Sequence, residues 1–315
     1  MKQVRNRRDF LKVSAAGSLG VMALGAMACK SGTGKVAAGH EAAAAVDLKS
    51  FEIGLQLYTI RDAIAADLPG SLKRVSELGY KNLELANYAD GKFYGYAPEE
   101  FKAMVEDLGM AIISSHTKVE AAGITLDNAK FMADAHAKLG VKYCIQPWVN
   151  EEERNVESYK RMIADWNKVG EIMKEFGIQF GYHNHNFEFA NLDGIVPYYE
   201  LFLKGLDPEL VIMELDLYWA SKAGQDPVEL FRNYPGRFHL FHMKDMTTKG
   251  EPYYDIVKDD ITSVGAGVID FKRILAERET AGLKYMFVED DNQGNGHPFK
   301  GIETSITNLT SDILV

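Results

Sequence analysis

The sequence predicts a (β/α)8 barrel, the TIM-barrel architecture, as a single domain over residues 50–315. Three observations support this fold class. Short apolar segments with strand character alternate eight times with amphipathic helical segments. Each strand–helix unit takes about 30 residues, which is enough for a helical crossover between parallel strands. The whole repeat is close to the ~250 residues that are usual for such a barrel.

The alternation runs along the whole of this region. The predicted strands cover residues 52–59, 81–87, 111–117, 142–149, 178–189, 211–219, 238–245 and 285–291. The predicted helices cover residues 68–79, 97–109, 125–140, 155–177, 196–205, 226–236, 270–282 and 298–314. Several helical segments end in a glycine before the next strand, as helix C-termini commonly do, namely at Gly79, Gly109, Gly140, Gly177 and Gly282.

An open doubly wound sheet is the alternative arrangement for alternating strands and helices. Such a sheet normally carries a glycine-rich phosphate-binding turn after its first strand. The corresponding segment here, "LYTIRD" (57–62), contains no glycine. We therefore favour the closed barrel.

The N-terminus has the pattern of an export signal. Paired arginines in "NRRDFLK" (6–12) precede an apolar run of small residues that ends at Ala28, and the arginines resemble the twin-arginine motif. Cys29 follows directly, as in bacterial lipoproteins, although ordinary cleavage nearby is the alternative. We expect a cleaved signal peptide over residues 1–28 and a flexible tether over 29–49. The protein is predicted to be periplasmic, or anchored to a membrane through a lipid on Cys29.

Charge and hydropathy narrow the range of partners. Residues 1–28 carry five basic residues and one acidic residue, so the rest of the chain has a net charge of −14. An acidic surface argues against a nucleic-acid partner. No apolar run after residue 30 reaches the roughly 18 residues of a membrane span. The predicted partner is a small molecule, and the sequence indicates no particular oligomer. Cys144 lies in an apolar strand pattern and is expected to be buried.

Polar side chains gather where the predicted strands end, which is where barrel enzymes place their active sites. Residues two apart on a strand share a face, so His183 pairs with His185, Glu214 with Asp216, and His242 with Lys244. In strand order the polar residues are Glu84, His116, Gln146, His183, His185, Glu188, Glu214, Asp216, His242, Lys244, Asp245, Glu289, Asp290 and Asp291.

Each of these residues also has an ordinary structural explanation. A single strand histidine is more often a core residue than a ligand, Glu188 would lie on the surface, and Asp290 and Asp291 would be solvated. Together, however, so many ionisable groups at one buried rim are costly unless they are paired or bind a metal. Mixed imidazole and carboxylate ligands suit Mn²⁺, Zn²⁺, Co²⁺ or Fe²⁺, with Mg²⁺ a further possibility.

Several motifs at these positions resemble those of the xylose-isomerase-like TIM-barrel superfamily, also called the sugar phosphate isomerase/epimerase family. The order and spacing of these motifs carry the resemblance, which covers residues 50–315. The chain is similar to an exported bacterial subgroup of the superfamily. The motifs are "GLQLYTIRD" (54–62), "YHNHNFEF" (182–189), "ELDLYW" (214–219), "FHMKD" (241–245), "VGAGVIDF" (264–271) and "VEDD" (288–291).

The resemblance implies a divalent metal held by Asp216, His242 and Glu289. The fourth ligand in the epimerase-like members is the Glu of an E-N-H run, where this chain reads H-N-H. His183 therefore stands in the place of that glutamate, as a ligand or as a base, and Glu289 is the second candidate for moving protons.

The other strand-end residues are expected to contact the substrate or to support those contacts. Trp219 would stack on a sugar face or pack at the rim, and Lys244 has the alternative of pairing with Asp245 or Glu214. The predicted substrate-binding residues are His185, His116, Gln146, Lys244, Trp219 and Glu84.

The resemblance implies removal of a proton next to a metal-polarised carbonyl group. We expect an isomerase or epimerase that acts on a free or oxidised sugar, since export disfavours sugar phosphates. A keto-glycoside lyase, a non-catalytic exported sugar-binding protein and an abasic-site endonuclease are the alternatives, and the acidic charge opposes the last. The long segment 244–269 is predicted to be a lid, with Tyr253 and Tyr254 covering the sugar.

Overall fold

The computed structural model describes residues 48–117, 123–191 and 196–315. The signal peptide predicted for residues 1–28, the lipid site at Cys29 and most of the tether lie outside these residues and stay predictions. Among the described residues, none of the helices has the length and apolar character that crossing a membrane requires.

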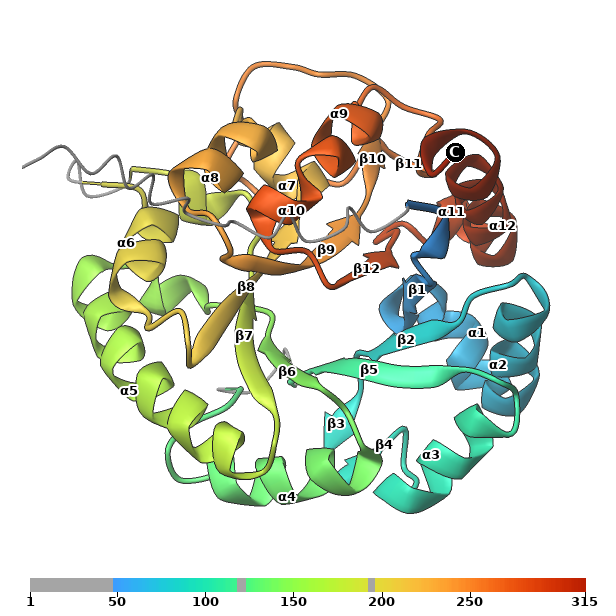
Figure 1. Cartoon of the computed structure of the whole chain (residues 1–315), viewed down its shortest axis with the longest axis horizontal. Coiled ribbons are helices and arrows are strands. Elements are labelled where there is room, and N and C mark those ends of the chain that lie inside the picture. The colour runs from blue at the N-terminus through green and yellow to red at the C-terminus, as the bar shows by residue number, and fades with distance from the viewer. Residues whose placement is uncertain (1–47, 118–122, 192–195) are drawn as a thin grey trace, which may run out of the picture. The chain divides into compact units, whose positions relative to one another are not determined.

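Eight parallel strands close into a barrel, which confirms the predicted fold class (Figure 1). Around the barrel their order is β1-β12-β9-β8-β7-β6-β5-β2. Each of the eight predicted segments contains one of these strands. Their bounds are β1 Ile53–Gln56, β2 Asn82–Leu85, β5 Ala111–His116, β6 Tyr143–Gln146, β7 Gln179–His183, β8 Val211–Asp216, β9 Phe238–Met243 and β12 Tyr285–Val288.

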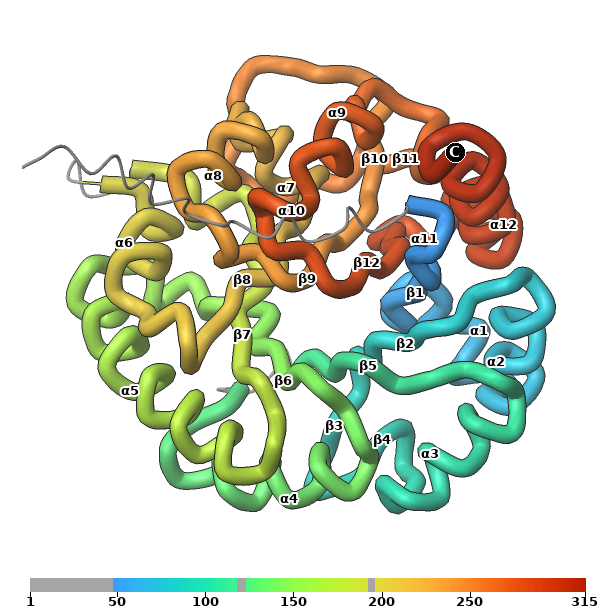
Figure 2. The backbone as a smooth tube through the Cα atoms, in the orientation of Figure 1, coloured from blue at the N-terminus to red at the C-terminus, as the bar shows by residue number. Residues whose placement is uncertain are grey.

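Helices surround the barrel, as the backbone tube shows (Figure 2). All five glycines predicted to end helices have positive φ, which confirms their predicted role at helix C-termini. The α-helices are α1 Arg61–Ala66, α2 Leu68–Glu77, α3 Pro98–Glu106, α4 Ala129–Leu139, α5 Val156–Glu175, α6 Tyr198–Gly205, α7 Leu217–Lys222, α8 Pro227–Asn233, α9 Phe271–Ala276, α10 Arg278–Ala281, α11 Gln293–Gly296 and α12 Pro298–Asn308. Shorter helical turns are η1 Leu48–Ser50, η2 Leu57–Ile60, η3 Glu151–Glu153, η4 Phe187–Phe189 and η5 Leu309–Ile313.

All eight strands end before their predicted segments do, and for two of them a local feature explains the end. β7 stops at His183, because Phe187–Phe189 form the turn η4. β8 stops at Asp216, because the Asp216 side chain caps helix α7 by accepting a hydrogen bond from the Trp219 backbone N–H at 2.8 Å. A carboxylate cap satisfies a helix N–H that would otherwise lack a partner.

The lower part of the barrel interior is apolar and tightly packed. A Cβ atom on Gly54 would lie 2.4 Å from the Phe287 ring, and one on Gly181 would lie 2.6 Å from Ile145 and 2.7 Å from Ile212. Glycine is therefore required on β1 and β7 where large side chains cross the barrel axis. The inner cluster consists of Ile113, Tyr143, Ile145, Ile212, Leu240 and Phe287.

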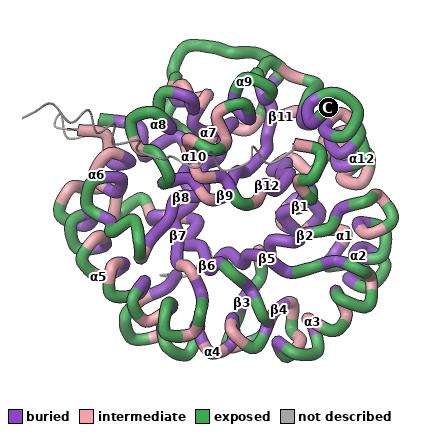
Figure 3. Tube along the Cα trace, in the orientation of Figure 1, coloured by how far each residue is buried: buried purple, intermediate pink, exposed green. Residues whose placement is uncertain are grey.

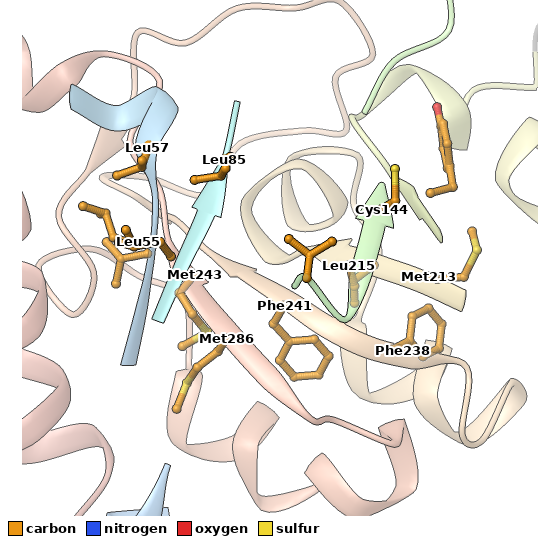
Figure 4. Close-up of a cluster of buried hydrophobic side chains, with 14 of the residues drawn as sticks. Leu55, Leu57, Leu85, Cys144, Met213, Leu215, Phe238, Phe241, Met243 and Met286 are labelled. Atoms are coloured by element: carbon orange, nitrogen blue, oxygen red, sulfur yellow. The ribbon is translucent and has the colours of Figure 1, made fainter. Parts of the chain in front are cut away.

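Alternate residues of the same strands face outward and form the main core between barrel and helices. Burial of the strands on both faces is evident in Figure 3, where the barrel is almost entirely buried. Cys144 is free and buried in this layer, as predicted. Figure 4 shows part of the outer layer, including Leu55, Leu85, Cys144, Met213, Leu215, Phe241 and Met286.

Two small antiparallel ladders extend from strand ends of the barrel. β3 (Tyr88–Ala89) pairs with β4 (Lys92–Phe93) after β2, and β10 (Asp245–Met246) pairs with β11 (Ile261–Thr262) after β9. Both lie in connections that follow the C-terminal ends of strands, where a barrel builds its site.

Candidate metal centre

Four predicted residues meet at the C-terminal ends of four adjacent strands. His183 ends β7, Asp216 ends β8, His242 lies near the end of β9, and Glu289 directly follows β12. All four are buried, and each offers one ligand atom within 4.8 Å of the others. Strand parity explains the meeting, because these positions continue the inward-facing series of Gly181, Ile212, Leu240 and Phe287.

The facing atoms of this rim cluster, defined as His183, Asp216, His242 and Glu289, have no hydrogen-bond partner among the described residues. They are His183 Nε2, Asp216 Oδ2, His242 Nδ1 and Glu289 Oε2. His183 Nε2 lies 3.4 Å from Asp216 Oδ2, and His242 Nδ1 lies 2.7 Å from Glu289 Oε2, but the angles are outside hydrogen-bond geometry. Unpaired buried polar atoms are rare and costly. Two imidazole nitrogens and two carboxylate oxygens that converge in this way fit a divalent metal.

Lys244 adds a positive charge beside the rim cluster. Its Nζ lies 3.0 Å from Asp216 Oδ2, 2.7 Å from Glu289 Oε2 and 2.9 Å from Asp291 Oδ2. Lys244 therefore pairs with these carboxylates rather than with Asp245 or Glu214.

This pairing governs the ionisation of the rim carboxyls. Burial alone would raise the pKa of the Glu289 carboxyl, but the charges of Lys244 and His242 outweigh it and hold that pKa well below its usual value. Burial is likewise outweighed at Asp216, mainly by Lys244, and the Asp216 pKa is lowered. Both carboxyls are thus ionised at neutral pH, as metal ligands must be.

A second group of polar residues lies deeper in the barrel. This deep cluster consists of Glu84, His116, Glu214 and His242, all of them buried and again within ligand distance of one another. Its facing atoms are joined by hydrogen bonds: His242 Nε2 lies 2.5 Å from Glu84 Oε2, and His116 Nε2 lies 2.9 Å from Glu214 Oε2. The other oxygen of Glu214, Oε1, has no hydrogen-bond partner among the described residues. Two neutral donors, Ser114 Oγ and Gln56 Nε2, also hydrogen-bond to Glu84.

The deep cluster holds one carboxyl ionised and one neutral. Burial would raise the pKa of Glu84, but the charges of His116 and His242 lower it to about 2. Burial and the neighbouring Glu84 charge raise the pKa of the Glu214 carboxyl well above its usual value. Two carboxyls at this spacing cannot both ionise easily in a dry interior.

Glu84 fixes the orientation of the His242 ring. An ionised carboxylate only accepts hydrogen bonds, so the His242 Nε2–H donates a hydrogen bond to Glu84. Nδ1 is thereby directed toward Glu289 at the rim. Although burial lowers it, the charges of Glu214, Glu289 and Glu84 raise the pKa of His242 well above its usual value, so a metal at Nδ1 would displace a proton from that nitrogen. Metal-binding histidines commonly donate their second ring nitrogen to a carboxylate in this way.

The histidines of "FGYHNHNFEF" (180–189) are held as neutral rings. Burial lowers the pKa of His183, and His242 lowers it further, despite the opposing pull of Asp216. Burial also lowers the pKa of His185 well below its usual value. The His185 ring packs edge-on against Trp148 at 4.8 Å between centroids, and its Nδ1 has no partner among the described residues.

A cavity of about 260 Å³ opens above the rim cluster. Among the predicted residues, His116, His183, His185, Lys244 and Glu289 line it. The volume of the cavity is somewhat below the ~300–1,000 Å³ of typical drug-sized sites. Its size and its polar side chains suit a small polar ligand.

Three predicted substrate contacts do not line this cavity. Glu84 lies below it in the deep cluster. Trp219 is fully buried, with its ring centroid 5.5 Å from that of His185 and 5.8 Å from Lys244 Nζ, so it packs behind the rim. Gln146 faces outward from β6, accepts hydrogen bonds from Thr117 Oγ1 and the Ile124 N–H, and lines a neighbouring cavity.

Sequence reasoning also missed residues that do line the cavity. Tyr58, Trp148 and Lys258 all contribute side chains to it. Each lies on a connection in the structure, because the strands that were predicted to include Tyr58 and Trp148 end at Gln56 and Gln146. Asp291 is another wall residue, and it is buried and paired with Lys244, which corrects the expectation of a solvated carboxylate. Asp290 is buried as well.

Glu188 is fully buried rather than on the surface. Its Oε1 accepts from the Tyr182 hydroxyl, and its Oε2 accepts from the His185 N–H at 2.9 Å. Glu188 therefore supports the turn that presents His185 to the cavity. Burial raises the pKa of its carboxyl to about 7.

The segment between β10 and β11, which belongs to the predicted lid 244–269, lies along one side of the cavity. The residues of this segment that line the cavity are not the two predicted tyrosines. Ile256 and Lys258 line the cavity. Tyr253 and Tyr254 do not line it and are 42% and 39% exposed. Asn186 Nδ2 ties the segment to the turn after β7 by donating to the carbonyls of Tyr253 and Asp255.

Comparison with known proteins agrees with this architecture. Residues 72–310 match the family described as "Xylose isomerase-like TIM barrel". The chain belongs to this family. A solved sugar phosphate isomerase/epimerase from Parabacteroides distasonis is 32% identical, with a TM-score of 0.70 over 84% of this chain and 95% of that one.

Two further likenesses are more distant. An inosose dehydratase from Clostridium tetani is 29% identical over 150 residues, or 43% of this chain and 48% of the relative. The match thus spans about half the length of that relative. The solved IOLI protein, which binds a zinc atom, is 14% identical with a TM-score of 0.65, and that likeness shows the fold alone.

Proposed function

We propose that the protein is a divalent-metal-dependent enzyme of the isomerase/epimerase type, acting on a free or oxidised sugar by removing a proton from the carbon beside a carbonyl group. The observation that carries this proposal is the convergence of two imidazole nitrogens and two carboxylate oxygens of the rim cluster at the base of a sugar-sized cavity. None of the four atoms has a hydrogen-bond partner among the described residues, and the two carboxylate oxygens form ion pairs with Lys244.

In this proposal His183, Asp216, His242 and Glu289 hold the metal. A bound divalent ion supplies Lewis-acid chemistry, polarising a carbonyl oxygen and stabilising the negative charge that develops on it. His183 replaces a carboxylate with a neutral ligand, which leaves more positive charge at the centre. The zinc of the IOLI protein, which has the same fold, is consistent with a metal at this site.

The chain supplies the groups that move the proton. Glu289 is ionised and lines the cavity, so it is the proposed base. His183 lines the cavity as a neutral ring and is the alternative base where it does not ligate the metal. The Lys244 ammonium, buried in the wall, adds positive charge next to the substrate oxygen.

The fate of the proton decides the reaction. Return of the proton to the same carbon from the opposite face epimerises the sugar, and return to the adjacent carbon isomerises it. Both outcomes conserve all atoms of the substrate. His185, with a free Nδ1 at the cavity wall, is placed to hydrogen-bond a substrate hydroxyl.

Elimination is a second candidate, favoured by the likeness to inosose dehydratases. It begins with the same proton removal. The β-substituent then departs with a proton, for instance a hydroxyl as water or a glycosidic group as its alcohol, and leaves an unsaturated ketone.

Metal analysis tests the proposal first. The purified full-length protein should hold about one divalent ion per chain, and Asp216→Ala should hold none. Asp134→Ala is the matched control, because Asp134 is a half-exposed aspartate on helix α4 that pairs with Lys138, away from both clusters. Retention of the ion by Asp216→Ala, or its absence from the wild type after reconstitution, would refute the proposal.

Deuterium exchange separates the reactions. The metal-loaded protein is incubated in heavy water with 2-keto-hexoses and with 3-keto-glucosides. Epimerisation or isomerisation gives a sugar in which one carbon-bound hydrogen is replaced by deuterium and no other atom is lost. Elimination instead releases an alcohol or water and gives an unsaturated ketone. A sugar that binds without any exchange would identify a binding protein instead.

A further inference from the structure

A second cavity adjoins the one above the rim cluster. It measures about 720 Å³, against about 260 Å³ for the first. Tyr58 and Ala86 line both cavities, so the two share a wall at the ends of β1 and β2. The second cavity, here called the tyrosine groove, is lined by residues of α1 and the start of α2 on one side and by the segment that follows β4 on the other.

Three tyrosines line the groove: Tyr58, Tyr94 and Tyr96. Tyr94 has a φ of +52°, which is unusual for a bulky residue. Its ring stacks on Phe101 at 5.3 Å and 23°, and its hydroxyl accepts a hydrogen bond from the Ala86 N–H at 3.2 Å. Strained backbone that is held by surrounding contacts is concentrated at ligand-binding positions.

Arg61 fixes the wall that the two cavities share. Its guanidinium lies 4.1 Å over the Tyr58 ring and donates to the Tyr58 carbonyl at 2.9 Å and to the Asp291 carbonyl at 3.0 Å. Asp291 belongs to the cavity above the rim cluster. One arginine therefore couples the position of the groove to that of the metal centre.

We infer that the tyrosine groove binds a second sugar ring, joined by a glycosidic bond to the ring that reacts at the metal centre. The inference rests on the proposed function, which places the reacting ring in the smaller cavity. Aromatic rings stack on the apolar C–H faces of sugars, and Tyr96 is the groove tyrosine that neither lies under Arg61, as Tyr58 does, nor stacks on Phe101, as Tyr94 does. The exposed Asn87 amide offers hydrogen bonds to the sugar hydroxyls. The substrate class is then a disaccharide-like ketone rather than a free monosaccharide.

Matched sugars test this inference by calorimetric titration of the metal-loaded full-length protein. D-Fructose is compared with lactulose, and D-glucose with cellobiose, because each disaccharide contains the smaller sugar. We expect at least one disaccharide to bind roughly tenfold more tightly than its component. Tyr96→Ala should weaken disaccharide binding by roughly three- to tenfold, the range of one lost aromatic contact, and leave monosaccharide binding unchanged.

Two further variants guard against a folding artefact. Asn87→Ala removes an exposed side chain of the groove wall and should weaken only the disaccharide. Tyr254→Ala removes an exposed tyrosine that lines neither cavity and should change neither affinity.

The outcomes separate the inference from the function on which it rests. Equal affinity for both members of each pair, or equal weakening of both by Tyr96→Ala, overturns the groove inference and leaves the proposed function standing. If none of the four sugars binds the metal-loaded wild type, the carbohydrate assignment fails, and the groove inference fails with it.

Discussion

The rim cluster and the deep cluster are built from the same residue types yet differ in how their atoms are satisfied. In the deep cluster Glu84 accepts from Gln56, Ser114 and His242. At the rim, one facing atom of each residue has no hydrogen-bond partner among the described residues. Burial and composition are alike in the two groups, so neither property alone identifies a ligand site. In the deep cluster a single oxygen, Glu214 Oε1, lacks a hydrogen bond among the described residues, so the more specific signal is a set of converging atoms that all lack one.

The largest expected effect separates the two clusters through their shared residue. His242→Gln removes the partner of the ionised Glu84 and should lower the free energy of unfolding of the metal-free protein by about 3–5 kcal/mol. His183→Gln removes a ring that makes no hydrogen bond and should lower it by less than about 1 kcal/mol. Urea unfolding after chelation measures both. Equal losses would show that the rim atoms are paired after all.

Metal removal should act on the rim alone. A free ion at a hundred times its dissociation constant stabilises the folded state by about 2.7 kcal/mol. Chelation of the wild type should therefore lower Tm, and adding the metal back should restore it. Asp216→Asn should show no shift in either direction. A Tm shift of the same size in this variant would contradict the prediction and assign the metal to the deep cluster.

Glu84→Gln tests the support that the deep cluster gives to the rim. The variant keeps the shape of the side chain but removes the charge that holds the proton on His242 Nε2. We expect a 10- to 100-fold loss of metal affinity, as for other carboxylates behind a metal-binding histidine. Competition with a fluorescent chelator measures it. Unchanged affinity would mean that the His242 ring is oriented by packing alone.

Glu188 provides a buried carboxyl outside both clusters, and the smallest expected effect when it is measured over one pH unit. Its pKa is raised to about 7, so between roughly pH 4.5 and 7 the folded state holds a proton that the unfolded state releases. The contribution of Glu188 to stability is thus present at low pH and lost as pH rises, by at most about 1.4 kcal/mol per pH unit. Glu188→Gln should flatten this part of the stability profile, measured by urea unfolding across pH. An unaltered slope would assign the pH dependence to other groups.

The sequence was sufficient for the fold because each strand and helix carried a local signal. Apolar segments marked the strands, and the glycines that end helices marked the units. Strand parity also placed His183, Asp216 and His242 on facing positions. The ends of β7 and β8 were misjudged because a carboxylate cap and a short turn have no apolar period to reveal them.

Gln146 shows why part of the site was not predictable. β6 lies in the apolar segment "KYCIQPWV" (142–149), which is buried on both faces. A strand of this kind gives no alternation from which the inward face can be read. The choice depends on register with β5 and β7, in which Tyr143 and Ile145 point inward and Gln146 points outward. Tyr58 and Lys258 reach the cavity from connections. In a connection the direction of a side chain depends on the fold of the whole chain and not on a local repeat in the sequence.

Asp216 joins the architecture and the proposed chemistry in one side chain. Its Oδ1 holds the first turn of α7, and its Oδ2 faces the rim cluster. Most replacements of Asp216 would therefore disturb a helix and a ligand position together. Selection on stability and selection on chemistry would act on the same substitutions. Asparagine is the exception, because it keeps the capping oxygen and alters only the other atom. A lineage that abandoned the chemistry but retained the barrel should accordingly pass through asparagine at this position.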